Sequence, residues 1–131
     1  MSLKDIEGLA VHRDERGFLV ELFRGNWCGG QVTLVEVAPG QSRGGHRHMH
    51  TNEKWVVVRG EGIVRLEMPN GTRTIVPVCG KLPRVIDMPP GTGHDIVNTG
   101  DEPLWLVYWQ DVPYDPENPD MTPWAWETRD D

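Results

Sequence analysis

The stretch from Gly40 to Gly60, GQSRGGHRHMHTNEKWVVVRG, concentrates side chains that can bind a metal ion. It contains three of the five histidines of the chain, His46, His48 and His50, and Glu53 follows them. In an extended strand alternate side chains face the same way, so these histidines would point to one side. The run KWVVVRG after Glu53 is rich in β-branched residues, which predicts a strand. Imidazoles and a carboxylate from adjoining strands suit a divalent cation such as Zn, Fe, Ni or Mn.

A second stretch, Pro89 to Asn98 (PPGTGHDIVN), adds a fourth candidate ligand. Its His94 follows a turn rich in Pro and Gly and stands at the start of another apolar strand. We therefore predict one metal site built from two distant hairpins. Its ligands are His46, His48, Glu53 and His94.

The two stretches together resemble the two cupin motifs. The first fits Gly-x5-His-x-His-x4-Glu-x6-Gly with Gly40, His46, His48, Glu53 and Gly60, and the second fits Pro-x-Gly-x2-His-x3-Asn with Pro89, Gly91, His94 and Asn98. The glycine that usually lies six residues before the proline of the second motif is Pro83 here. The resemblance implies a metal-binding jelly-roll barrel. Similar cupins also exist that use these histidines for acid-base chemistry without metal.

The rest of the chain is a succession of short apolar runs separated by Gly, Pro, Asn or Asp. The predicted strands are Gly17–Arg24, Gln31–Val37, Lys54–Arg59, Gly62–Met68, Arg73–Val78, Arg84–Met88, His94–Asn98 and Leu104–Gln110. Asn70-Gly71 is typical of a two-residue hairpin turn, because both positions tolerate positive φ. No window has a persuasive helical period. The pattern predicts an all-β sandwich or barrel, and the cupin motifs favour the small jelly-roll barrel, also called a double-stranded β-helix.

The length of 131 residues predicts a single domain. We divide it into an N-terminal arm (1–13), a barrel (14–110) and an acidic, Pro-rich tail (111–131). The tail contains seven acids and one arginine, so it carries −6 of the net charge of −7. This distribution leaves no basic surface for nucleic acid, whereas Arg24 and Arg43 could bind a small anionic ligand.

The sequence also predicts the cellular location of the protein. Its first residues lack a charged leader with a long apolar core, and no apolar run approaches a membrane span. Cys28 and Cys79 are the only cysteines, unlike the dense frameworks of small secreted domains. We expect a cytoplasmic protein without a membrane partner and without a disulfide.

The interior of a small barrel is filled by alternate side chains of each strand. Trp55 and Val57 should share the inner face with Glu53, while Lys54 points to solvent. On the last strand Leu104, Leu106, Tyr108 and Gln110 should face inward, which makes Tyr108 a candidate for the cavity wall. The opposite face carries Trp105 and Trp109. With Trp124 and Trp126 of the tail these tryptophans suggest a homodimer interface.

A closer resemblance lies outside the motifs. The segments DERGFLVELFR, GQVTLVEVAPGQSRGGHRHMHTNEKWVVV, VIDMPPGTGHDIVNTG and YDPENPD are similar to the C-terminal cupin domain of bifunctional bacterial enzymes of capsular polysaccharide synthesis. This similarity spans residues 14–120. It implies a metal-containing module that epimerises a nucleotide-linked 4-keto-6-deoxy sugar at C3, with His46, His48, Glu53 and His94 in the metal site.

Epimerisation beside a ketone needs an acid and a base on opposite sides of the carbon. His50, Tyr108 and Tyr114 have suitable chemistry, and Zn is the favoured metal. We therefore favour an enzyme, a nucleotide-sugar epimerase or isomerase. Two alternatives stay open: a metal-dependent dioxygenase, because a site with open coordination positions also admits oxygen, and a non-catalytic sugar-binding or sensor cupin.

Overall fold

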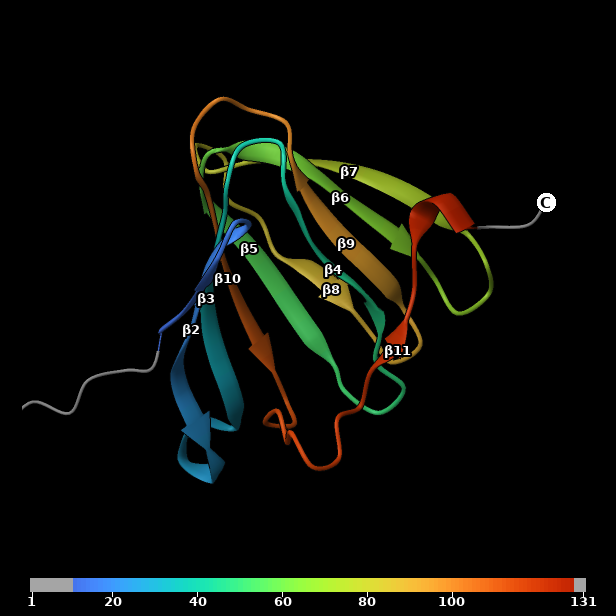
Figure 1. Cartoon of the computed structure of the whole chain (residues 1–131). Coiled ribbons are helices and arrows are strands. Elements are labelled where there is room, and N and C mark those ends of the chain that lie inside the picture. Colours follow the sequence, from blue (N-terminus) through green and yellow to red (C-terminus); the bar gives the residue numbers. More distant parts are fainter. Residues whose placement is uncertain (1–10, 129–131) are drawn as a thin grey trace, which may run out of the picture.

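The computed structural model describes residues 11–128, which form two antiparallel sheets facing one another (Figure 1). In spatial order, the six-stranded sheet consists of β1 (Val11–Asp14), β2 (Gly17–Gly25), β3 (Gly30–Val37), β10 (Leu104–Gln110), β5 (Glu53–Arg59) and β8 (Ile86–Met88). The five-stranded sheet consists of β11 (Thr122–Pro123), β4 (Ser42–Arg47), β9 (Gly93–Asn98), β6 (Glu61–Glu67) and β7 (Arg73–Cys79). Two short 3-10 turns, η2 (Asn26–Cys28) and η3 (Trp126–Thr128), complete the secondary structure of this part. The predicted all-β architecture is confirmed.

Each of the eight predicted strands is present, with ends that differ by a few residues. The largest difference is in β8, which begins at Ile86 rather than Arg84. Of the predicted arm, residues 1–10 lie outside the described residues and residues 11–13 belong to β1, which pairs with β2. Of the predicted tail, residues 129–131 also lie outside them, and β11 pairs with β4. Between residues 11 and 128, none of the helical segments could span a membrane.

The core between the sheets follows the alternation expected of half-buried strands. On β10, Leu104 and Leu106 are almost fully buried. On β5, Trp55 and Val57 are buried on the same face as Glu53, as predicted. Lys54 is exposed and pairs with Asp87 across the β5–β8 ladder. The inner face of β5 therefore carries a carboxylate at one end and apolar side chains along the rest.

A β-bulge in β4 decides where His46 points. Arg43 pairs with Ile96 and His46 pairs with His94, so three steps along β4 match two steps along β9. The extra residue lies in the Gly44-Gly45 pair, whose φ angles of 91° and 80° suit glycine. In an unbroken strand Arg43 and His46 would face opposite sides. Because of the bulge, His46 and its register partner His94 both face the interior.

The acidic tail is part of the barrel wall. After β10 the chain runs along the lower edge of Figure 1 and reaches β11 beside β4, so it connects the two sheets. The Trp124 amide donates to the Gly45 carbonyl (2.9 Å), and its indole Nε1 donates to Glu67 (3.2 Å). Trp105 likewise bonds Glu36 within its own sheet. These tryptophans pack on their own chain, and the predicted dimer stays a prediction.

Candidate metal centre

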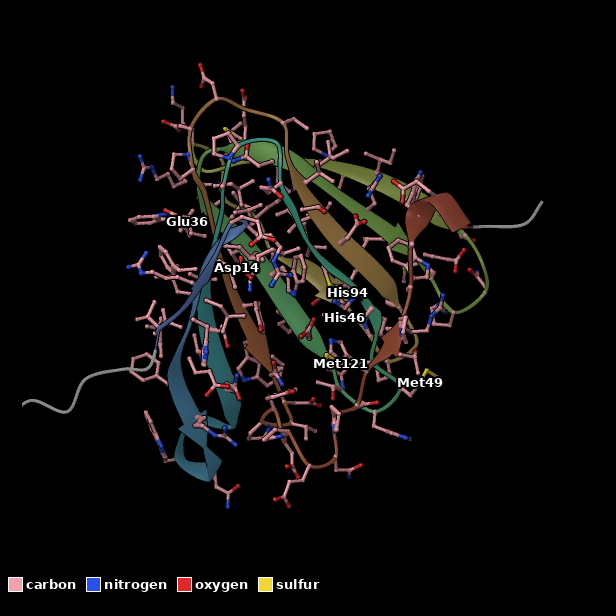
Figure 2. All side chains as sticks on the ribbon, viewed as in Figure 1. Asp14, Glu36, His46, Met49, His94 and Met121 are labelled. Carbon is pink, nitrogen blue, oxygen red and sulfur yellow. The ribbon has the colours of Figure 1, made fainter. Side chains whose placement is uncertain are left out.

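Three histidines and one glutamate meet inside the barrel at the end where the tail crosses. His46 lies on β4, His94 on β9, His48 directly follows β4, and Glu53 is the first residue of β5. One nitrogen from each histidine forms a group whose members lie within 4.8 Å of one another. Figure 2 shows His46 and His94 between the two sheets. The structure therefore brings together all four residues that the two sequence motifs predict as ligands.

The carboxylate of Glu53 faces two of the imidazoles. Its Oε1 lies 3.3 Å from Nε2 of His48, and its Oε2 lies 3.4 Å from Nε2 of His94. The indole Nε1 of Trp55, two residues along β5, donates to Oε2 (3.1 Å). Trp55 thus fixes the orientation of the carboxylate.

The other ring nitrogens of these histidines contact backbone carbonyls. Nδ1 of His48 lies 2.6 Å from the carbonyl oxygen of Asp120, and Nδ1 of His94 lies 3.2 Å from that of Thr92. A carbonyl oxygen can only accept a hydrogen bond, so in each ring Nδ1 carries the proton. Nε2 of each ring is then left as the nitrogen that can bind a metal.

Both Nε2 atoms are buried and have no hydrogen-bond partner. Burying polar atoms without partners costs free energy, and native structures rarely retain them without a reason. A divalent cation between the rings and the carboxylate would satisfy these atoms at once. The donor set of three imidazoles and one carboxylate therefore fits a cation such as Zn²⁺.

The pKa shifts put most of these groups in the form that binds a cation. Burial and the neighbouring His94 and His48 lower the pKa of His46 to about 3, and burial lowers that of His94. Burial would raise the pKa of Glu53, but the surrounding imidazoles lower it more, so the carboxylate is ionised. Burial lowers the pKa of His48, whereas Glu53 and the Asp120 carbonyl raise it, with a net rise.

A cavity of about 480 Å³ opens beside the cluster, large enough for a sugar. His46, His48 and Glu53 form part of its floor. The tail supplies a second wall, with Pro113, Tyr114, Asp115, Asn118, Asp120 and Met121. Between these walls Gln31 bonds Glu21 (3.2 Å), Thr33 (3.1 Å) and the amide of Tyr114 (3.0 Å). This network joins the tail to β3 and lines the cavity with polar groups that are already positioned.

The predicted acid-base residues occupy different places. Tyr108 lines the cavity from β10, and Tyr114 lines it from the tail. Burial and the charge of Glu53 raise the pKa of Tyr108, which keeps its phenol protonated. His50 is exposed in the turn after β4 and is not among the lining residues. The structure therefore brings both tyrosines to the cavity and leaves His50 beside it.

Asp120 also belongs to the site, although no motif in the sequence marked it. Its carboxylate accepts hydrogen bonds from the amides of Met49 (2.9 Å) and His50 (2.7 Å) and from the hydroxyl of Thr51 (2.9 Å). Burial raises the pKa of this carboxyl, but these bonds lower it more, so it is ionised. The available signal was its place at the end of YDPENPD, a segment too rich in Pro and Asp to be a strand.

Residues 12–122 match the family described as the polysaccharide biosynthesis C-terminal domain. The chain belongs to this family. The resemblance stated from the sequence is thereby confirmed. The matched range runs from β1 to β11 and includes the four clustered side chains and both cavity walls.

Two curated relatives are named for sugar chemistry. The chain is 33% identical over 113 residues to a UDP-2-acetamido-2,6-beta-L-arabino-hexul-4-ose reductase of Pseudomonas aeruginosa, covering 84% of this chain and 30% of the relative. It is 30% identical over 128 residues to a probable low-salt glycan biosynthesis epimerase, Agl13, of Haloferax volcanii, covering 88% of this chain and 82% of the relative. The chain thus spans less than a third of the reductase and most of the epimerase.

Solved structures confirm the cupin fold. The capsular polysaccharide assembling protein CapF of Staphylococcus aureus superposes with a TM-score of 0.82 at 31% identity, covering 92% of this chain and 32% of CapF. A cupin-2 domain from Rhodospirillum rubrum gives a TM-score of 0.69 at 18% identity, over 92% of this chain and 76% of that domain, which supports the fold alone. The jelly-roll prediction is correct, and the chain is a domain related to the reductases and epimerases of polysaccharide synthesis.

Proposed function

We propose that the domain binds one divalent metal ion through His46, His48, Glu53 and His94, and that Zn²⁺ is the favoured ion. The observation that supports this most directly is the pair of buried Nε2 atoms of His48 and His94, which face Glu53 without hydrogen-bond partners. Ni²⁺, Mn²⁺ and Fe²⁺ suit the same donors. When bound, the ion would supply Lewis-acid stabilisation of negative charge on a substrate oxygen.

We further propose that the domain epimerises a nucleotide-linked 4-keto-6-deoxy sugar at C3. In this reaction a base removes the C3 proton and the electron pair of the C3–H bond passes to the ketone oxygen. The pair returns to C3 and reforms the ketone when an acid delivers a proton to the opposite face. The relationship to an epimerase and to a reductase of a hexulose nucleotide supports this substrate class. The cavity beside the four residues, whose mostly apolar lining includes polar groups such as Gln31 and Gln110, could hold such a sugar.

The two tyrosines suit the two proton transfers. Tyr108 reaches the cavity from β10 and Tyr114 from the tail segment that follows it, and an inversion needs two proton-transfer groups, one for each face of the carbon. The raised pKa of Tyr108 favours it as the proton donor. Since His50 is exposed and outside the lining, the geometry favours the tyrosines over His50 for these roles.

Solvent exchange tests the reaction directly. In deuterated water, wild-type protein with a nucleotide-linked 4-keto-6-deoxy sugar should incorporate deuterium at C3. Tyr108→Phe should lower this exchange about a hundredfold with unchanged zinc content. Trp109→Phe, the next residue on β10 and on its outer face, is the matched control. Absence of exchange in a panel of such sugars would contradict the epimerase and favour a sugar-binding module.

We propose a reducing, cytoplasmic setting and a homodimer for the protein. Cys28 and Cys79 are both free thiols, which suits a reducing compartment. Light scattering at high micromolar concentration tests the dimer, and a monomer would contradict it.

A further inference from the structure

We infer that Asp120, although it lies on the tail, is a positioning residue that holds His48 in the orientation needed to bind a metal. This inference rests on the metal site proposed above and extends it to a residue outside the four ligands.

Asp120 binds four of the five residues between β4 and β5. Its carbonyl oxygen accepts from Nδ1 of His48, and its two carboxylate oxygens bind the next three residues, Met49, His50 and Thr51. Four hydrogen bonds from one residue therefore reach four consecutive positions. This segment connects β4 to β5, and a predicted ligand stands at each end of it, His48 and Glu53.

The two ends of the segment have other partners, since the Gly91 amide donates to the carbonyl of His48 (2.6 Å) and Asp111 binds Asn52, but the amides of Met49 and His50 between them are bound by Asp120. Residues 48–52 belong to neither sheet, and Met49 and His50 are exposed. Backbone amides held by a buried or half-buried carboxylate form strong, charge-assisted bonds. Without the carboxylate of Asp120, the amides of Met49 and His50 would turn to water, and the backbone that joins His48 to the Asp120 carbonyl would lose its fixed position.

Asp120 is itself fixed by the strand that follows it. Thr122 pairs with Arg47 and Pro123 with His46 in the β11–β4 ladder. The Trp124 amide then bonds the carbonyl of Gly45. The position of Asp120 relative to His48 is thus set by the same strand that carries His46, which makes the tail and the ligand cluster one unit.

The other histidines do not depend on Asp120 in this way. His94 is oriented by the carbonyl of Thr92 in its own chain segment, and His46 by the β4–β9 ladder. A change at Asp120 should therefore affect His48 selectively. This selectivity separates a positioning role from general destabilisation of the fold.

The first measurement is the affinity for Zn²⁺ alone, by competition with a chromogenic chelator. Asp120→Ala should weaken zinc binding by about 10–100-fold, as is usual when a group that orients a ligand is removed. Asp120→Asn keeps the shape of the side chain but turns amide hydrogens toward backbone N–H groups, so it should weaken binding too. Glu127→Gln is the matched control, because it removes one tail carboxylate that pairs with Arg65, and it should keep wild-type affinity.

The second measurement needs neither metal nor substrate. Long-range proton–nitrogen NMR spectra of the metal-free protein at about pH 9, well above the usual imidazole pKa, report which ring nitrogen carries the proton. Wild-type His48 should show the single Nδ1–H form. Asp120→Ala should give a mixture for His48 and leave His94 unchanged, and Asp120→Asn serves in its place if the Ala variant does not fold.

The outcomes decide between the proposals. A variant at Asp120 that keeps wild-type zinc affinity, or that keeps the single His48 form, overturns the inference. Equal perturbation of His48 and His94 also overturns it, since that result indicates a general loss of structure. If the wild-type protein itself binds no zinc, the metal proposal fails, and the NMR comparison still shows whether Asp120 positions His48.

Discussion

Two polar clusters meet at β4, one on each of its faces, and they differ in whether their polar atoms have partners. Neighbouring residues of β4 enter different clusters, because His46 faces the interior and Arg47 the outer face. The inner cluster consists of His46, His48, Glu53 and His94. The outer cluster consists of Arg47, Glu67, Arg73 and Trp124. The tail contacts both clusters, the inner one through Asp120 and the outer one through Trp124.

The outer cluster is complete without a ligand. Oε2 of Glu67 accepts from Arg47 (2.6 Å) and Trp124 (3.2 Å), and Oε1 accepts from Arg73 (2.9 Å). Arg73 also donates to the carbonyl of Trp126. In the inner cluster, by contrast, two buried nitrogens have no hydrogen-bond partner. A cluster whose charges are paired stabilises a fold, whereas a rigid cluster with unpartnered donors and acceptors indicates a ligand site.

The largest expected effect is on zinc binding when an inner ligand is removed. His94→Ala deletes the ligand supplied by β9, so zinc affinity should fall by more than about a hundredfold, beyond the range seen for groups that only orient ligands. Arg73→Ala in the outer cluster should leave zinc affinity unchanged. Chelator competition measures both, and an unchanged affinity in His94→Ala would show that the inner cluster is not the zinc site.

The next effect is on thermal stability when zinc is added. A ligand that binds only the folded state at about a hundredfold excess over its Kd stabilises it by about 2.7 kcal/mol. For a domain of this size the midpoint of unfolding should rise by roughly 10 °C. The rise should be absent in His94→Ala and present in Arg73→Ala. A wild-type protein whose midpoint does not respond to zinc would contradict the site.

The sequence was sufficient to predict most of the fold and the four residues that meet in the inner cluster. The strand pattern and two spaced motifs placed His46 and His94 correctly, because strand alternation and short turns are local properties. The bulge at Gly44-Gly45 was not predicted, although His46 reaches the interior through it. The extended alternation that grouped His50 with His46 and His48 does not hold, because β4 ends at Arg47 and His50 lies in an exposed turn.

The role of the tail could not be predicted from its composition. Asp120 and His48 are 72 residues apart, and no periodicity in the sequence links them. The tail was interpreted from its net charge as a separate acidic segment. In the structure several of these acids accept specific hydrogen bonds: Asp111 binds Asn52, Asp120 binds the segment after His48, and Glu127 binds Arg65. Such contacts depend on the path of the chain across the barrel mouth, which only the structure shows.

A smaller effect is expected from the charge at the centre of the outer cluster. Hydrogen bonds from Arg73, with those from Arg47 and Trp124, lower the pKa of Glu67 from 4.5 to about 2. Because the pKa is lowered in the folded state, the ionised carboxyl stabilises the fold above about pH 4.5, and this contribution is lost as the pH falls toward 2. Glu67→Gln should cost about 2 kcal/mol of unfolding free energy at neutral pH.

The pH dependence identifies the cause of that loss. Between wild type and Glu67→Gln the difference in unfolding free energy should shrink as the pH is lowered from 6 to 3, measured by urea denaturation at about one-unit steps. Zinc affinity at neutral pH should be the same in both proteins. A difference that is constant with pH would show that Glu67 contributes through packing rather than through its charge.

The smallest effects come from a matched pair of tryptophans, one in contact with each cluster. Trp55 donates to Glu53 on the inside, and Trp124 donates to Glu67 on the outside, at 3.1 and 3.2 Å. Replacing either by Phe removes one indole N–H and keeps an aromatic ring, so each should lose about 1 kcal/mol of unfolding free energy. Only Trp55→Phe should also weaken zinc binding, by about tenfold, because Glu53 loses the bond that orients it. Equal zinc affinities in the two variants would mean that Trp55 stabilises the core without affecting how Glu53 binds zinc. The difference in zinc binding between the two clusters would then be confined to the four ligands themselves.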